Sequence, residues 1–385
     1  MEIKKVCVVI TARASYSRIR SALHAINKHA DLELQLVVAA SALIDRYGGA
    51  VEIMEKDGFE IKAKVHNVVE SSSLIGQAKT AGLGIIELSN VFDSIKPDCV
   101  VTIADRYETI STAISAAYMN IPLVHIQGGE VTGNIDEKVR HAITKLADLH
   151  LVSTPKSKER VIKMGENPYS VFISGCPSID IAKQVLNEEK SLFDIYAKYG
   201  GVGNRPNYEE GYMVVMQHPV TTEYQEAKYQ IEQTLSAVTQ VGLPAFWFWP
   251  NVDGGGDGTS KGIRIFREQN PNGKIHFFRN MEPEDFLRLL KHSKCIVGNS
   301  SVGIRECSYL GVPSVNIGSR QSGREKGDNV IEVDYDSEQI IQAINRQLEN
   351  GSYAPDELYG NGDAGFEIAK IIAVTDIKSN KILQY

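Results

Sequence analysis

Two serines and a glutamate stand in the run GNSSVGIRE, which follows a short apolar stretch and precedes a segment of helical spacing. A strand that turns into a helix presents free backbone N–H groups and the positive end of the helix dipole, and both favour a bound phosphate. Ser300 and Ser301 can add hydroxyl donors, and Gly303 would let a ligand approach the backbone closely. Glu306, one turn further on, can accept hydrogen bonds from a pair of sugar hydroxyls. The run therefore predicts a nucleotide site, although a serine helix cap followed by a structural glutamate also fits this motif.

Acids and imidazoles gather after two other expected strands. The run ADRYE places Asp105 and Arg106 directly after residues 99–103. The run HIQGGEVTGNIDEKVRHAITK carries four more candidate groups, His125, Glu130, Asp136 and His141. The two glycines before Glu130 permit a tight turn that can aim its carboxylate inward. Carboxylates and imidazoles gathered in one cleft indicate proton transfer.

These groups also have purely structural interpretations. Asp105 and Arg106 can form a local ion pair that caps a helix, and Glu130 can be an ordinary turn residue. His141 lies on a helical segment, where we interpret it as a packing histidine. The histidines without a surrounding motif are interpreted as structural; they are His24, His29, His66, His150, His276 and His292.

Further polar groups are expected at strand tips. Arg13 and Ser17 belong to the run TARASYS after residues 6–11, and an arginine there can bind a phosphate through two parallel hydrogen bonds. His218 follows another strand in the run QHPVTTE, where the next residue is a proline that fixes the turn. Asn251 follows an aromatic strand and can contact a base or a sugar.

Composition excludes several classes of protein. A chain of 385 residues favours two domains. Lys and Arg total 41 against 48 Asp and Glu, the formal net charge is -7, and no basic block suits nucleic acid. Five scattered cysteines without a C-x-x-C pair favour a reducing compartment. Because no segment reads as a signal peptide or a membrane span, we expect a cytoplasmic protein that binds neither nucleic acid nor membrane.

No cofactor and no metal are expected. The run GGGDGTSKG lacks the glycine before lysine that a Walker phosphate loop needs, and no G-x-G-x-x-G run follows a strand. Patterns such as H-E-x-x-H, which would indicate a metal site, do not occur in the sequence. A dehydrogenase, a kinase and a metalloenzyme are therefore disfavoured.

Short apolar runs alternate with amphipathic segments, which is typical of parallel sheets with crossover helices. Strands are expected at 6–11, 33–39, 99–103, 123–126, 149–152, 171–173, 212–216, 245–249, 276–277, 295–297 and 314–317. Helices are expected at 16–27, 74–95, 109–118, 156–163, 222–239, 284–292 and 302–310. A polar stretch at 198–211 separates two Rossmann-like halves of an α/β fold, and the cleft between them is the expected ligand site. Residues 71–73 and 254–258 are expected to be loops.

Eight runs of this chain, taken in order, resemble those of the UDP-N-acetylglucosamine 2-epimerases. They are TARASYSRI, ADRYE, HIQGGEVTGNIDEKVRHAITKLAD, GCPSID, QHPVTTE, WPNVDGG, GNSSVGIRE and GSRQSGRE. The resemblance extends from about Val6 to about Ile372 and is strongest to the hydrolysing branch, which serves sialic-acid biosynthesis. It implies a GT-B-like fold, with two Rossmann-like domains whose parallel sheets face each other across a cleft. The implied domains are 1–177 on the sugar side and 178–364 on the UDP side, with a C-terminal helix at 365–385 that packs back on the first domain.

The resemblance also implies roles for individual residues. Ser300 and Ser301 would bind the diphosphate of UDP, and Glu306 would bind its ribose. The other residues expected to contact UDP or the sugar are Arg13, Ser17, Arg106, His125, His218, Asn251, Gly303, Arg320 and Arg324. A UDP-sugar is the expected substrate, UDP is the expected product, and a homodimer or homotetramer is the expected assembly.

The chemistry of such a site follows from the substrate. The proton on carbon 2 of the sugar is not acidic, so inversion there is easiest if UDP leaves carbon 1 as that proton is removed. The resulting 2-acetamidoglucal then adds water and leaves as N-acetylmannosamine. This elimination needs a base below the ring and hydrogen-bond donors to the departing diphosphate. Glu130 and Asp105 are the expected proton-transfer pair, Asp136 is a third candidate, and His218 is expected to assist the departure of UDP.

Two positions depart from the family pattern. Ser15 stands where hydrolysing relatives commonly carry aspartate, and Gln127 replaces an acid before the two glycines; both are expected to face the sugar. The loss of two negative charges fits an alternative substrate, the UDP-linked 2,4-diacetamido-trideoxy hexose on the route to legionaminic acid, with UDP-N-acetylglucosamine as the first choice. Two other classes stay open, a GT-B glycosyltransferase, which would need an acceptor, and a non-catalytic nucleotide-sugar sensor.

Overall fold

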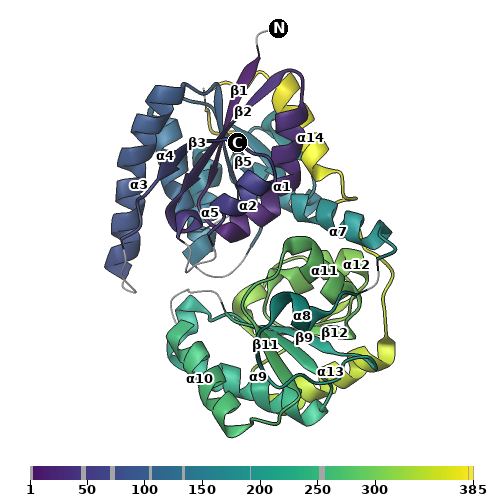
Figure 1. Cartoon of the computed structure of the whole chain (residues 1–385). Helices are drawn as coiled ribbons and strands as arrows, with labels where there is room; N and C mark the ends of the chain where they lie inside the picture. Colours follow the sequence, from purple (N-terminus) through teal and green to yellow (C-terminus); the bar gives the residue numbers. More distant parts are fainter. Residues whose placement is uncertain are drawn as a thin grey trace. The chain divides into compact units, whose positions relative to one another are not determined.

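The computed structural model describes residues 3–44, 49–69, 74–103, 106–131, 135–190, 192–250, 256–379 and 381–384, with the backbone alone at 74, 135–136, 221 and 256–257. The chain divides into two compact units (Figure 1). Unit 1 comprises Met1–Glu130, Ile135–Asp180 and Gly360–Tyr385, and unit 2 comprises Val131–Asn134 and Ile181–Tyr359. Within the described ranges, no helix is long and apolar enough to cross a membrane.

Unit 1 is built on a parallel sheet of order β3-β2-β1-β4-β5-β6-β7. Its strands are β1 (Lys4–Ile10), β2 (Leu32–Ala39), β3 (Ile61–Val65), β4 (Cys99–Ile103), β5 (Leu123–Ile126), β6 (Leu149–Val152) and β7 (Val171–Ile173). The central strands are continuous apolar runs because helices cover both faces of the sheet. The strands that follow β1 are added on one side of it up to β3, and those from β4 on are added on the other side. The pair β1 and β4 therefore marks the topological switch point of unit 1.

The helices of unit 1 form two layers. They are α1 (Arg13–Lys28), α2 (Val51–Lys56), α3 (Leu74–Ile95), α4 (Thr109–Tyr118), α5 (Ile135–Leu146), α6 (Pro155–Lys163), α7 (Pro177–Asn187), which continues into unit 2, and α14 (Ala364–Val374). Alternate residues of β1 serve the two layers: Val6 and Val8 pack in one core with α1 and α14, and Cys7 and Val9 pack in another with α3 and α4. Figure 1 shows the helices of α14 and α1 side by side, although the two are far apart in the sequence.

Unit 2 repeats this topology with a second sheet, of order β14-β13-β12-β9-β10-β11-β8. Its strands are β8 (Val202–Gly203), β9 (Met213–Met216), β10 (Ala245–Phe248), β11 (Ile275–Phe278), β12 (Cys295–Gly298), β13 (Ser314–Ile317) and β14 (Val330–Val333). Its helices are α8 (Ile195–Tyr199), α9 (Ala227–Val241), α10 (Gly256–Gln269), α11 (Pro283–Lys291), α12 (Glu306–Leu310) and α13 (Ser337–Asn350). All described pairs are parallel except the edge strand β8, which runs antiparallel to β11.

The two Rossmann-like halves predicted from the sequence are confirmed, but the strands β3, β8 and β14 and the helices α2, α7, α8, α10 and α13 were missed. The three missed strands lie at sheet edges, where most of their residues are partly or fully exposed and carry a weak strand signal. The expected loop at 254–258 is wrong for Gly256–Gly258, which begin α10; residues 254 and 255 and the expected loop at 71–73 lie outside the described residues. Glycine is used in α10 because the helix approaches α9 closely. A Cβ at Gly262 would lie 2.6 Å from Cγ2 of Ile231.

A cluster of charged residues anchors the C-terminal tail to unit 1. The Glu166 carboxylate accepts hydrogen bonds from Nζ of Lys145 at 2.6 Å and Nζ of Lys381 at 2.5 Å, and it lies 3.1 Å from Nε2 of His150. Burial raises the pKa of Glu166, but these hydrogen bonds outweigh burial and hold the pKa at about 2. Burial also keeps the pKa of His150 below its ordinary value. The cluster therefore ties residue 381 to α5 and to the segment after α6.

Replacing the anion of this cluster should destabilise the fold. Glu166→Gln should lower the free energy of unfolding by about 3 kcal/mol near neutral pH, because cations around a buried site lose their partner. The pKa of about 2 lies below the ordinary value of 4.5, so the contribution of Glu166 is present above pH 4.5 and is lost as the pH falls toward 2. Thermal unfolding from about pH 7 to about pH 3 should show the difference between wild type and variant shrinking.

The matched control is Glu159→Gln, which removes a carboxylate from an exposed i,i+4 pair with Lys163. Such pairs contribute little, so this variant should unfold at the wild-type temperature. A stability difference for Glu166→Gln that stays constant with pH would contradict the role assigned to its charge.

Candidate functional site

The switch point of unit 2 lies between β9 and β12, and the tips of these strands come very close together. Met216 pairs with Gly298, the last residue of β12, whose φ is +135°. A Cβ at Gly298 would collide with the carbonyl oxygen of Met216, so only glycine fits there. His218, 7% exposed, follows β9, and Asn299 follows β12. Parallel sheets bind ligands at this place, beyond the carboxyl ends of the two strands between which the strand order reverses.

The serine turn after β12 is tighter than the sequence predicted. The expected helix over 302–310 is a 3-10 turn, Ser301–Gly303, followed by the short helix α12. The Ser300 hydroxyl oxygen accepts a hydrogen bond from the Val302 N–H at 3.4 Å, and the Ser301 hydroxyl accepts one from Nη2 of Arg305 at 2.9 Å. Both serines are partly exposed. The turn therefore leaves hydroxyl groups accessible at the strand tip.

Gly303 packs closely on β13. A Cβ at this position would press against the side chains of Ser314 and Ile296, so the missing side chain lets the turn pack there. This packing alone calls for glycine, and the approach of a ligand to the Gly303 backbone stays a prediction.

Glu306 is a buried carboxylate with an unused acceptor. Glu306 is the first residue of α12 and is 5% exposed, yet its Oε2 accepts no hydrogen bond from the described residues. Nε of Arg305 lies 4.0 Å from this oxygen. A buried carboxylate oxygen without a donor is costly, and a ligand hydroxyl would supply one. Arg305, 2% exposed, was not among the sequence candidates, although an arginine between Ile304 and Cys307 is an unusual charge in an apolar run.

Two arginines after β13 were expected near the same tip. Arg320 lies in the 3-10 turn Ser319–Gln321, and its Nη1 donates to the carbonyl oxygen of Asn299 at 3.1 Å. Arg324, 7% exposed, follows this turn, and its backbone N–H donates to the carbonyl oxygen of Gln321 at 3.3 Å. The structure thus places Arg320 directly against the residue that precedes the serine turn.

In unit 1 the expected residues follow the ends of β1 and β4. Arg13 begins α1, and the Ser17 hydroxyl donates to the Arg13 carbonyl oxygen at 3.2 Å. Nε of Arg106 donates to Oε1 of Glu108 at 3.1 Å, and Glu108 is 1% exposed. Arg106 is therefore in a local ion pair, but with Glu108. Asp105, the partner considered from the sequence, lies outside the described residues.

Glu130 ends a constrained loop after β5. Gln127 and Gly129 both have positive φ, +65° and +75°. The loop carbonyls are held by two arginines, since Nη1 of Arg140 donates to the Glu130 carbonyl at 2.8 Å and Nη1 of Arg160 donates to the Gly129 carbonyl at 3.2 Å. These bonds hold the backbone on both sides of the Gly129–Glu130 peptide, which is the tight turn that the two glycines predicted.

The Glu130 carboxylate itself is buried and oriented. It is 4% exposed, and Oε1 accepts a hydrogen bond from the Ser153 hydroxyl at 3.1 Å. The Ser153 hydroxyl thereby orients the carboxylate, which is a group able to accept a proton. Ser153, which follows β6, gave no signal in the sequence.

His125 lies within β5, the strand expected at 123–126. It is fully buried, and its Nδ1 is 3.2 Å from the Thr144 hydroxyl oxygen on α5. Strand alternation turns this ring into the packed layer under α5. Asp136 lies on α5 with its side chain undescribed, and Asn251 lies outside the described residues.

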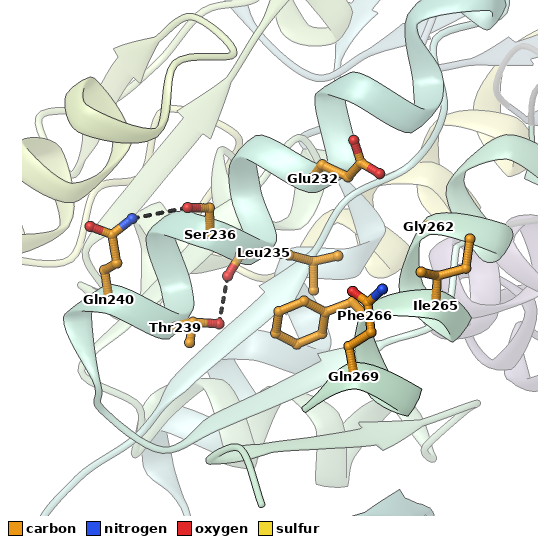
Figure 2. Close-up of a pocket in the computed structure, with 9 residues that line it drawn as sticks. All are labelled: Glu232, Leu235, Ser236, Thr239, Gln240, Gly262, Ile265, Phe266 and Gln269. Carbon is orange, nitrogen blue, oxygen red and sulfur yellow. Dashed lines mark hydrogen bonds between the residues drawn. The ribbon is translucent and has the colours of Figure 1, made fainter. Parts of the chain in front are cut away.

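One cavity lies away from both sets of strand tips. It measures about 370 Å³ and lies between α9 and α10, lined by residues such as Leu235, Phe266 and Gln269 (Figure 2). These residues belong to the carboxyl halves of the two helices, which return toward the amino ends of the parallel strands. Ligands of parallel sheets bind at the opposite end. Among the described residues, no group of three acids, histidines or cysteines could hold a metal ion.

Comparisons with known proteins agree on one family. A family model for UDP-N-acetylglucosamine 2-epimerase matches residues 24–373. A UDP-N,N'-diacetylbacillosamine 2-epimerase (hydrolyzing) of Legionella pneumophila is 30% identical over 386 residues, covering 100% of both chains. A UDP-N-acetylglucosamine 2-epimerase of Neisseria meningitidis is 32% identical over 363 residues, covering 94% of this chain and 92% of that protein. The solved structure of a Neisseria meningitidis UDP-GlcNAc 2-epimerase bound to UDP-GlcNAc has the same fold, with a TM-score of 0.77, 16% identity and coverage of 96% and 99%.

The contact between β9 and β12 should tolerate no side chain at Gly298. Gly298→Ala should cost about 3 kcal/mol or more, because it adds a clash with the Met216 carbonyl to an unfavourable backbone conformation. Gly242→Ala is the matched control, since Gly242 also has positive φ, +72°, in the left-handed helical region, and its Cβ would lie 3.9 Å from the nearest atom, the carbonyl oxygen of Gln240. The control should cost only about 1 to 2 kcal/mol. Denaturant unfolding of both variants measures the difference, and equal losses would contradict the close approach described here.

Proposed function

Because the chain belongs to the UDP-N-acetylglucosamine 2-epimerase family, we propose that it is a hydrolysing epimerase. It converts UDP-N-acetylglucosamine and water to N-acetylmannosamine and UDP, for the synthesis of sialic-acid-type sugars. The observation that carries the proposal is the buried Oε2 of Glu306, which lacks a donor and lies beside the serine turn at the switch point of unit 2. A ribose hydroxyl is the donor that this oxygen would accept.

Unit 2 supplies the UDP site in this proposal. Ser300 and Ser301 donate their hydroxyls to the diphosphate, and Arg320 and His218 stabilise the charge that develops as UDP leaves carbon 1. The positions of these residues around the tips of β9, β12 and β13 support this assignment. Arg324, Asn251 and the backbone of Gly303 are further UDP contacts in the same proposal.

Unit 1 supplies the proton transfer. Glu130 removes the proton from carbon 2 of the sugar, and its orientation by the Ser153 hydroxyl supports this role. Asp105 and Asp136 are the other acids of the proposal. Arg13, Ser17 and Arg106 contact the phosphates or the sugar, whereas the position of His125 inside β5 fits packing better than binding.

We also propose that the protein is cytoplasmic, because its five cysteines are scattered and free, as suits a reducing compartment. Homodimers or homotetramers are proposed from the family resemblance.

A second substrate is favoured by one observation. The Legionella relative that matches this chain over its full length is named for UDP-N,N'-diacetylbacillosamine. The sequence argument from Gln127 is weaker than it first was, because the Gln127 amide donates to Sγ of Cys176 at 2.9 Å. Gln127 and Cys176 are both buried, so this amide is used within the fold. The UDP-linked 2,4-diacetamido-trideoxy hexose is therefore the second candidate, on the same mechanism.

Turnover in deuterated water tests the reaction. With UDP-N-acetylglucosamine and no acceptor, we expect UDP release and free N-acetylmannosamine with deuterium at carbon 2, because solvent delivers the new proton after elimination. NMR follows both products. Deuterium in a sugar still attached to UDP would instead identify the non-hydrolysing reaction, and release of UDP only with an acceptor would identify a transferase. Running the diacetamido sugar beside UDP-N-acetylglucosamine at equal concentration compares kcat/KM for the two candidates.

Two isosteric variants separate binding from chemistry. Glu130→Gln should retain UDP affinity and lose about 100- to 10,000-fold in kcat, because it lacks the base. Glu306→Gln should instead weaken UDP binding by about tenfold. The carboxylate that accepts from the ribose loses its charge, and one of its two oxygens is replaced by an NH2 group, which donates. Calorimetry with UDP and steady-state kinetics measure both effects. Turnover at the wild-type rate in Glu130→Gln would remove that residue from the mechanism.

A further inference from the structure

The tips of β9 and β12 are joined by a side chain that the proposed mechanism does not use. Asn299 is fully buried, and its Oδ1 accepts the His218 N–H at 2.7 Å while its Nδ2 donates to the His218 carbonyl oxygen at 2.8 Å. Its own backbone N–H donates to the Met216 carbonyl oxygen at 3.1 Å. The strand ladder between β9 and β12 is thereby extended by a side chain beyond the point where the backbones separate.

We propose that Asn299 is a positioning residue that sets the direction of His218 and of Arg320. The inference rests on the proposed function, because these two side chains are the ones assigned to the departing UDP. Asn299 itself is fully buried and acts through its two neighbours.

Only a carboxamide of this length makes both bonds to His218. It offers one donor and one acceptor side by side, as a peptide group does, and the His218 N–H and carbonyl fix which end faces which. An aspartate would present an acceptor to the His218 carbonyl oxygen, and an alanine would leave two buried backbone groups unpaired.

Holding the backbone of His218 also holds its ring. Both backbone polar groups of His218 are bound to Asn299, and the next residue, Pro219, has a fixed φ and no N–H. The peptide groups on either side of His218 therefore cannot rotate without breaking a bond. The direction of its Cα–Cβ bond is set, and a ring that is 7% exposed has little further freedom.

The carbonyl oxygen of Asn299 carries the constraint to a third strand tip. It accepts hydrogen bonds from Nη1 of Arg320 at 3.1 Å and from Nε2 of Gln321 at 2.9 Å. Both donors lie in the 3-10 turn after β13. One residue thus links the groups that follow β9, β12 and β13, and Ser300 is its direct neighbour in the chain.

The test compares Asn299→Asp with Asn67→Asp. Asn67, 3% exposed, makes the same kind of paired contact in unit 1, where Oδ1 accepts the Ala40 N–H at 3.0 Å and Nδ2 donates to the Thr80 carbonyl oxygen at 3.1 Å. The two substitutions remove the same donor from a buried pair of bonds. Comparable losses of thermal stability are expected, so any difference in function reports position and not folding.

Asn299→Asp should lower kcat/KM by about 100- to 1000-fold, the usual effect of one displaced stabilising group, with a larger loss in kcat than in UDP affinity. Asn67→Asp should stay within about threefold of wild type. In the protein without ligand, the NMR titration midpoint of the His218 ring should move in Asn299→Asp and not in Asn67→Asp. Equal kinetics and an equal His218 titration in the two variants would overturn the proposal.

A milder variant keeps the test open if Asn299→Asp does not fold. Gln321→Met removes one donor to the Asn299 carbonyl together with the Oε1 of Gln321, which has no hydrogen-bond partner among the described residues. We expect UDP affinity to fall by about three- to tenfold. Unchanged UDP affinity and an unchanged His218 titration would count against the proposal.

Failure of the proposed function looks different from failure of this inference. If the wild type binds UDP but does not turn over any UDP-sugar, the proposed function is wrong, and UDP affinity and the ligand-free titration of His218 still decide the role of Asn299. If the wild type turns over and Asn299→Asp matches Asn67→Asp, only the positioning role is wrong.

Discussion

The close approach of β9 to β12 in unit 2 is the constraint on which the candidate UDP site depends. Glycine at 298 lets the backbone of β12 come against Met216, and the next residue, Asn299, bonds to the backbone of His218. Because the strands are held this tightly at their ends, the residues that follow them emerge at one place. The serine turn, His218 and Arg320 share a strand-tip surface for this reason.

In unit 1 the loop that carries Glu130 is also held by hydrogen bonds to its backbone, but from other side chains. There the loop after β5 is held from the helices, since Arg140 and Arg160 donate to the carbonyls of Glu130 and Gly129. In unit 2 a side-chain amide continues a strand ladder, whereas in unit 1 cations fix a turn that has left the sheet. Both devices satisfy buried backbone groups and fix the direction of a nearby functional side chain.

Two buried glutamates, Glu166 and Glu306, differ in whether the described residues supply hydrogen-bond partners to their carboxylate oxygens. Glu166 is buried with two lysine partners and the imidazole of His150, so its charge is used for stability and its pKa is held at about 2. Glu306 is buried with an oxygen that no described residue satisfies. A ligand donor can complete such an oxygen, whereas the Glu166 carboxylate already has its partners, and this makes Glu306 the better functional candidate of the two.

The sequence by itself determined the alternation of strands and helices, the two Rossmann-like halves, the family, and the position of Ser300 and Glu306 after a buried strand. These follow from local hydrophobic periodicity and from motifs of adjacent residues. It could not determine that Gly303 serves packing on β13, that His125 faces α5, or that Ser153 and Asn299 bind the candidate residues Glu130 and His218. Those roles depend on contacts between residues distant in the chain, which only the tertiary fold brings within hydrogen-bond distance.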